Sequence, residues 1–187
     1  MWLSNYFPTW FSSWLRYLGF VGKKGRLVFL GLDCAGKTTL MGFLANGEIK
    51  WHSPTLMPTG EQFWVGDVQF SAYDLGGHRQ ARRVWKEYCM KTDGIVFLVD
   101  AADKERLQEA GQELKNLLDD PECEDLPVAI MFNKTDRLDA LTETDLITGL
   151  DIHKLLVDNC RRKVFMVSIL RKRGIYEAIK WLSTFLK

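Results

Sequence analysis

The chain has 187 residues, 47% hydrophobic and 26% charged, a balance typical of one globular domain rather than a disordered or fibrous protein. Its net charge of +1 argues against a nucleic-acid partner, because nucleic-acid-binding proteins carry a basic surplus that neutralises phosphates. The cysteines at positions 34, 89, 123 and 160 form neither a CxxC pair nor a zinc pattern, so we expect reduced thiols in the cytosol.

The first 24 residues differ in composition from the rest and are predicted to be an amphipathic membrane-binding segment. Their bulky side chains form one stripe if the segment is helical, with the helix beginning near Pro8. The stripe contains Trp2, Tyr6, Phe7, Trp10, Phe11, Trp14 and Leu18. Polar residues interrupt it too often for a bilayer span or a secretory signal. Aromatic rings with Arg16, Lys23 and Lys24 favour reversible contact with a membrane surface through residues 1–18. The alternative is that the stripe packs on the domain or forms a homodimer face.

Residues 25–187 alternate short apolar runs with amphipathic stretches, which predicts an α/β fold with a six-stranded, mostly parallel sheet flanked by helices. The predicted strands are rich in Val, Ile, Phe, Leu and Met. They are Arg26–Gly31, Glu61–Val65, Val68–Asp74, Gly94–Asp100, Pro127–Asn133 and Lys163–Ser168. The second and third are expected to be joined by a turn at Gly66-Asp67.

The stretches between these runs have the periodicity of helices that bury one face. The predicted helices are Lys37–Asn46, Arg79–Met90, Lys104–Leu118, Thr142–Cys160 and Ile175–Leu186. The fourth contains Gly149, where the helix is expected to break if it is interrupted.

A phosphate-binding loop is predicted at residues 31–38, which read GLDCAGKT and match GxxxxGK(S/T) between a strand and a helix. Backbone N–H groups of such a loop and the helix N-terminus attract anions, lysine reaches the outer phosphates, and the threonine hydroxyl binds Mg²⁺. The predicted cofactor-binding residues here are Asp33, Cys34, Ala35, Gly36, Lys37, Thr38 and Thr39. The alternative is a glycine-rich turn carrying a surface lysine.

Two further strand ends carry motifs that fit the same site. Asp74 ends the third strand, where a carboxylate can hold Mg²⁺ through water, and Gly77 follows at the position that contacts a terminal phosphate. Residues 133–136 read NKTD, in which the Asp136 carboxylate can accept hydrogen bonds from guanine N1–H and the 2-amino group. Taken alone, each motif could be turn or helix-capping chemistry. Together they predict a guanine-nucleotide site binding GTP or GDP with Mg²⁺, in which Asn133 and Lys134 also contact the base.

The order of these motifs resembles the Sar branch of the Arf/Sar small GTPases. The resemblance is carried by DLGGHRQARRVWK at 74–86, GIVFLVDAAD at 94–103 and WLS at 181–183, and it covers nearly the whole chain. It implies that Thr59 binds Mg²⁺ and senses the γ-phosphate, that Asp33 lies beside metal and phosphates, and that His78 orients the attacking water. It further implies that the backbone of Ser168, Ile169 and Leu170 touches guanine.

The resemblance also implies a biological role, that of the GTP hydrolase that starts COPII coat assembly. The expected partners are the endoplasmic reticulum membrane, inner coat subunits that include a GTPase-activating protein, and a membrane-bound exchange factor. The protein would act at the cytoplasmic face of the endoplasmic reticulum, cycle with the cytosol and extend to the Golgi. An Arf-like adaptor at another membrane and a non-hydrolysing scaffold are the alternatives. Cys34, Gly60 and a short segment before Lys163 depart from the pattern of the branch, and none of them removes a predicted ligand.

Overall fold

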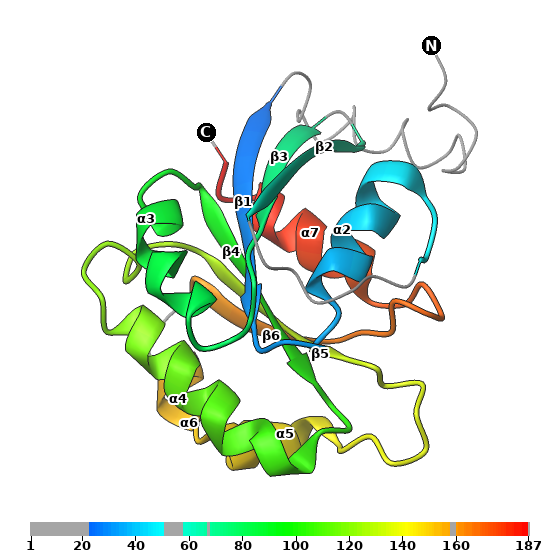
Figure 1. Cartoon of the computed structure of the whole chain (residues 1–187), viewed down its shortest axis with the longest axis vertical. Helices are drawn as coiled ribbons and strands as arrows, with labels where there is room; N and C mark the ends of the chain where they lie inside the picture. Colours follow the sequence, from blue (N-terminus) through cyan, green and yellow to red (C-terminus); the bar gives the residue numbers. More distant parts are fainter. Residues whose placement is uncertain (1–22, 51–57, 67, 158–159, 187) are drawn as a thin grey trace.

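The computed structural model describes residues 23–50, 58–66, 68–157 and 160–186. Their centre is a six-stranded sheet with the order β2-β3-β1-β4-β5-β6 (Figure 1). β2 pairs antiparallel with β3, whereas β3, β1, β4, β5 and β6 are parallel to one another. The strand bounds are β1 Lys24–Gly31, β2 Thr59–Val65, β3 Val68–Asp74, β4 Gly94–Asp100, β5 Val128–Asn133 and β6 Arg162–Met166.

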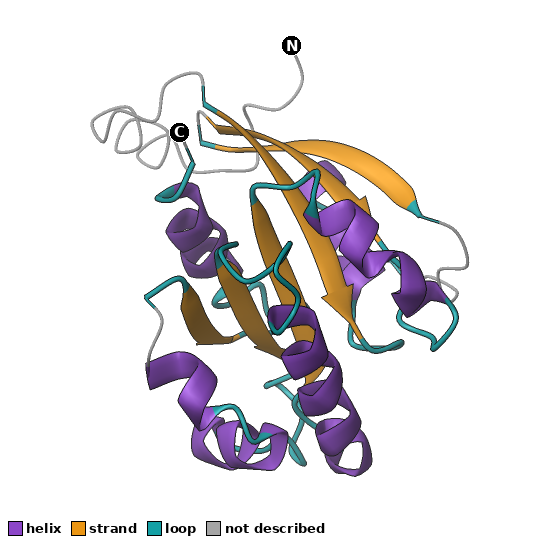
Figure 2. Cartoon of the chain, turned by 90° about the vertical axis from the view of Figure 1, so that its left-hand side faces the viewer, coloured by secondary structure: helices purple, strands orange, loops and turns teal. Residues whose placement is uncertain are grey.

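Helices cover both faces of the twisted sheet (Figure 2). Their bounds are α2 Lys37–Asn46, α3 Trp85–Cys89, α4 Leu107–Leu118, α5 Glu143–Leu150, α6 His153–Val157 and α7 Ile175–Ser183, with 3₁₀ turns at Ala81–Val84 and Lys104–Arg106. Successive β1 residues point to opposite faces, so Leu27 and Phe29 pack with α2 and α7. Val28 and Leu30 pack in the second core with α3, α4 and α5. β1 is thus buried on both sides, which fixes the strand that leads into the predicted phosphate loop.

The predicted six-stranded α/β fold is confirmed, with differences at element ends. The predicted helix Arg79–Met90 begins as a 3₁₀ turn, because the His78 carbonyl accepts hydrogen bonds from the N–H groups of both Ala81 and Arg82. The predicted helix Thr142–Cys160 is not continuous among its described residues. It breaks at Asp151, which has a left-handed φ of 53°.

Two further predicted ends lie beyond the observed ones. The strand expected to reach Ser168 ends at Met166, because Ser168 instead exchanges backbone hydrogen bonds with Arg173 across a loop. The last helix ends at Ser183, after which Thr184 and Phe185 make the shorter turns of a fraying terminus. The predicted segment 1–24 lies outside the described residues except for Lys23 and Lys24. In the described part of the chain, none of the helices combines the length and apolar character needed to cross a membrane.

Candidate active site

A cavity of about 640 Å³ opens at the carboxyl ends of the parallel strands, where this class of sheet binds its ligands. The loops after β1, β3 and β5 and the β6–α7 loop all contribute to it. Most predicted site residues line the cavity, namely Asp33, Cys34, Gly36, Lys37, Thr38, Thr39, Gly77, His78, Asn133, Lys134, Asp136, Ile169 and Leu170. The fold therefore brings together motifs that are separated by about a hundred residues in the chain.

The loop between β1 and α2 has the backbone shape of an anion cradle. Cys34 and Gly36 both adopt positive φ values, 62° and 102°, and Gly36 forms the N-cap of α2. A Cβ on Gly36 would lie 2.5 Å from the Asn133 amide nitrogen, so glycine is needed there. That amide donates to the Ala35 carbonyl at 2.9 Å, which ties the loop to the end of β5. The α2 N-terminus consequently faces the cavity.

Lys37 is held under the loop rather than extended into solvent. Its side chain is buried, and Nζ donates to the Leu32 carbonyl at 2.8 Å. Burial lowers the pKa of Lys37 to about 8, although the nearby carboxylates of Asp74 and Asp33 act in the opposite direction. A polyphosphate in the cavity would stabilise the protonated amine, so this lysine is suited to neutralise phosphate charge.

Two oxygen-bearing side chains meet beside Lys37 at the end of β3. The Thr38 hydroxyl donates to Asp74 Oδ2 at 2.6 Å, and Asp74 is fully buried. Thr59 begins β2 directly opposite Asp74 in the antiparallel register. Hydroxyl and carboxylate oxygens are the ligands of Mg²⁺, which usually binds one or two protein groups together with substrate phosphates. The arrangement of Thr38 and Asp74 fits such an ion.

Gly77 and His78 close the cavity on the side of the phosphate loop. A Cβ on residue 77 would lie 2.1 Å from the Asp33 backbone nitrogen, so only glycine permits this approach. His78 lines the cavity, and its Nδ1 accepts a hydrogen bond from the Ala81 N–H at 3.2 Å. In the neutral ring this places the proton on Nε2. The ring is thereby oriented by the turn that follows it.

The predicted base-recognition residues are organised by a second hydrogen-bond network. Asn133 is buried and accepts from the Ile169 N–H at 3.3 Å through its Oδ1 atom. Lys134 adopts a positive φ of 65° and pairs with Asp100 at 2.6 Å. The Ser168 hydroxyl donates to Asp136 Oδ1. These contacts hold the NKTD motif, which begins at the last residue of β5, against the loop that carries Ile169. The motif and this loop both line the cavity.

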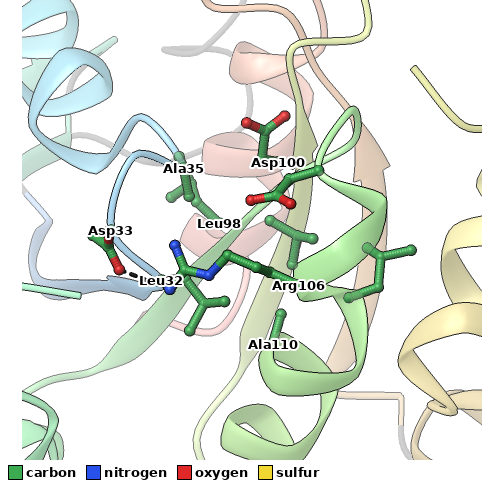
Figure 3. A pocket seen from close by; sticks show the side chains of 10 residues that line it. Leu32, Asp33, Ala35, Leu98, Asp100, Arg106 and Ala110 are labelled. Atoms are coloured by element: carbon green, nitrogen blue, oxygen red, sulfur yellow. Dashed lines mark hydrogen bonds and ion pairs between the residues drawn. The ribbon is translucent and has the colours of Figure 1, made fainter. Parts of the chain in front are cut away.

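Asp33 has a partner that lies far away in the sequence. Its Oδ1 atom accepts a hydrogen bond at 2.8 Å from Nη2 of Arg106, which follows β4 (Figure 3). This hydrogen bond is the main cause of the lowered pKa of Asp33. The carboxylate therefore stays ionised and is oriented by the guanidinium.

A family model described as the ADP-ribosylation factor family matches residues 11–186. The chain belongs to the Arf family. Three curated proteins named as small COPII coat GTPases, SAR1 or SAR1B, are similar to it and identify its Sar branch. Those from Giardia intestinalis and Nicotiana tabacum are each 38% identical, with 96% and 95% of this chain and 99% and 98% of the relative covered. The protein from Dictyostelium discoideum is 36% identical, with 92% of each chain covered.

A solved Arf-family structure agrees with the fold. The Arl6 BBS3 small GTPase of Trypanosoma brucei, with the nucleotide analogue GppNp bound, has a TM-score of 0.78 and 28% identity. It covers 86% of this chain, and 96% of its own length is matched. Arf-family and Sar-branch proteins are GTP hydrolases, so this chain is a small GTPase that binds GTP and GDP.

Some residues of this Arf-family site differ from the sequence prediction. Ala35, Asp74 and Ser168 do not line the cavity but form hydrogen bonds with residues that do. Thr59 does not line it either. Three cavity-lining residues were not predicted, namely Ile49, Lys50 and Arg137. Arg137 could have been found, since it directly follows NKTD, whereas Ile49 and Lys50 carry no motif. Arg106 could not be found from spacing, because its contact depends on the neighbouring positions of β1 and β4.

Proposed function

We propose that this GTPase recruits the COPII coat at the endoplasmic reticulum membrane when GTP is bound. The observation that supports this most strongly is the likeness to three small COPII coat GTPases over 92–96% of the chain. The cavity is consistent with the switching step, because phosphate-loop, Gly77 and base-binding segments border one space. The alternative of an Arf-like adaptor at another membrane predicts membrane binding without coat recruitment.

Mg²⁺ is proposed to be held beside the phosphates by Thr38 and Asp74. Their oxygens lie 2.6 Å apart. Thr59, which pairs with Asp74 in the antiparallel register, would be the third ligand. Asp33 would act beside the metal with its charge already shared with Arg106. The ion would neutralise charge on the outer phosphates, while Lys37 supplies the second positive charge.

His78 is proposed to orient the attacking water during hydrolysis. The residue lines the cavity next to Gly77, and because Nδ1 accepts the hydrogen bond from Ala81, Nε2–H is the donor of the neutral ring. Slow intrinsic hydrolysis would make the protein a timer, and a coat subunit acting as a GTPase-activating protein would accelerate it. Hydrolysis would then return the switch segments to their GDP arrangement.

The amino-terminal segment, residues 1–24, is proposed to be the membrane anchor, with residues 25–187 as the GTPase domain. Insertion of the aromatic stripe in residues 1–18 would bring the GTP-bound protein to the cytoplasmic face of the endoplasmic reticulum. A membrane-bound exchange factor would load GTP there, and the protein would return to the cytosol after hydrolysis. The protein would bind the Golgi membrane through the same segment.

Liposome flotation with purified inner coat subunits tests the division of labour between anchor and site. Removal of residues 1–18 should abolish GTP-dependent flotation and leave nucleotide affinity within about twofold, since anchor and cavity use separate segments. His78→Gly should bind GTP and float normally but release slowly with the coat present. His153→Gly, an exposed histidine on α6, is the matched control. Flotation of the truncated protein, or normal release of His78→Gly, contradicts the proposal, and flotation without coat recruitment favours the adaptor.

A further inference from the structure

A single carboxylate on α4 joins two arginines, each of which contacts a residue that lines the cavity. Arg82 donates from Nε to the Gly77 carbonyl and from Nη2 to Glu109 Oε1, each at 2.7 Å. Arg106 donates from Nε to Glu109 Oε2 at 3.0 Å and from Nη2 to Asp33 Oδ1 at 2.8 Å. An unbroken chain of hydrogen bonds to charged groups therefore runs from Gly77 to Asp33.

The two residues at the ends of this series of hydrogen bonds border the nucleotide cavity. Gly77 and Asp33 line it, and their backbones touch so closely that no Cβ fits on residue 77. Gly77 also carries the N–H expected to meet the terminal phosphate. If Gly77 moves when that phosphate is lost, Arg82 must either follow its carbonyl or release it.

Glu109 is the residue that both arginines bind. The Arg82 side chain is only 7% exposed, so the guanidinium depends on its acidic partners for charge compensation. Glu109 uses one carboxylate oxygen for each arginine, and these two contacts, that of Arg82 first, lower the pKa of its carboxyl. Glu113 offers a contrast. It accepts a hydrogen bond from Arg82 Nη1 at 2.8 Å, and in the described part of the chain it forms no ion pair with Arg106.

We propose that Glu109 is a positioning residue that couples the phosphate loop to the Gly77–His78 segment. It holds Arg82 and Arg106 at the same time, so the arrangement of Asp33 depends on whether Gly77 is in its GTP or GDP position. The inference rests on the proposed GTP-dependent switching and adds the route that links the two segments. Coupling of this kind shifts the relative affinity for two ligands rather than the affinity for both.

Glu109→Gln is the test variant, because it keeps the side-chain shape and removes the charge that both arginines share. Glu113→Gln is the matched control, since it makes the same change at an acid that pairs with Arg82 and, among residues the structure describes, not with Arg106. For each protein we would measure affinity for GDP and for a non-hydrolysable GTP analogue. Hydrogen exchange of residues 31–38 and 75–82 would be compared in the two complexes.

Glu109→Gln should lower the ratio of analogue to GDP affinity about fivefold, the lower end of typical coupling between sites. The exchange of both segments should then respond less to the nucleotide, whereas Glu113→Gln should keep the ratio within about twofold of wild type. An equal loss of affinity for both nucleotides, or equal effects of the two variants, overturns the coupling. Identical exchange in the two wild-type complexes would overturn the switching itself, whereas a wild-type difference unchanged in Glu109→Gln would overturn only the linkage.

Discussion

Nucleotide binding is expected to take up a proton at mildly alkaline pH, because Lys37 is buried and has a pKa of about 8 in the protein without nucleotide. At pH 8.5, roughly three quarters of the molecules would carry a neutral amine at that pKa. Phosphates beside Nζ raise the pKa and restore the ammonium ion. Binding should therefore take up about 0.75 proton at pH 8.5 and about 0.1 at pH 7 through this residue.

Calorimetric titration with GDP and Mg²⁺ in two buffers of different ionisation heat measures this uptake directly. Lys37→Arg is the control, because a guanidinium stays protonated throughout this pH range. Its residual proton exchange reports all other groups, including those of the nucleotide. The difference between the two proteins isolates Lys37 even if the variant binds GDP more weakly.

A difference near zero at pH 8.5, or a net release of protons attributable to Lys37, would refute the reasoning.

The lowered pKa of Lys37 also makes the stability of the folded protein depend on pH. Between pH 8 and 10.5 the folded protein without nucleotide binds fewer protons at Lys37 than the unfolded chain. The contribution of this residue to stability should therefore rise with pH across that window.

Two further predictions concern the base site and the packing of the helices. Asp136→Asn should weaken GTP binding on the order of a hundredfold and shift preference to XTP, since two hydrogen bonds to a carboxylate are lost; competition binding measures both, and unchanged GTP preference contradicts the assignment. Gly111→Ala should destabilise the fold by about 1–3 kcal/mol in urea unfolding, because its Cβ would lie 2.2 Å from the Leu150 carbonyl oxygen. Gly60→Ala, where a Cβ meets only ordinary contacts, is the control, and equal stability of the two variants would contradict the packing argument.

The elements best predicted from the sequence are those whose sequence pattern has one physical cause. β3 and β4 have the predicted ends. β4 is an apolar run that ends where burial decreases at Asp100, whereas β3 alternates buried and half-buried residues up to Asp74. α2 also has the predicted bounds, between Gly36 and Gly47, which adopt left-handed conformations at its two ends. The phosphate loop and NKTD motif could be located for the same reason, since each follows a recognisable strand.

Elements set by contacts at a distance were predicted less well. The break at Asp151 was expected at Gly149, but Gly149 remains helical and the left-handed turn falls two residues later. The 3₁₀ turn at Ala81–Val84 depends on the His78 carbonyl, which accepts two backbone hydrogen bonds at once. Neither feature has a propensity signal strong enough to separate it from an ordinary helix.

Asp33 illustrates how tertiary structure changes the meaning of a motif residue. From its place in the phosphate loop, Asp33 is predicted to lie beside the metal and the phosphates. One of its carboxylate oxygens, however, accepts a hydrogen bond from Arg106, which lies 73 positions away. The pair forms because β1 and β4 are adjacent and parallel, so the loops that leave their carboxyl ends meet. A carboxylate shared with a guanidinium brings less net negative charge to the phosphates than a free one. This arrangement allows an acidic residue to stand beside a polyphosphate, and it makes the charge of the nucleotide site depend on Arg106 as well as on the loop itself.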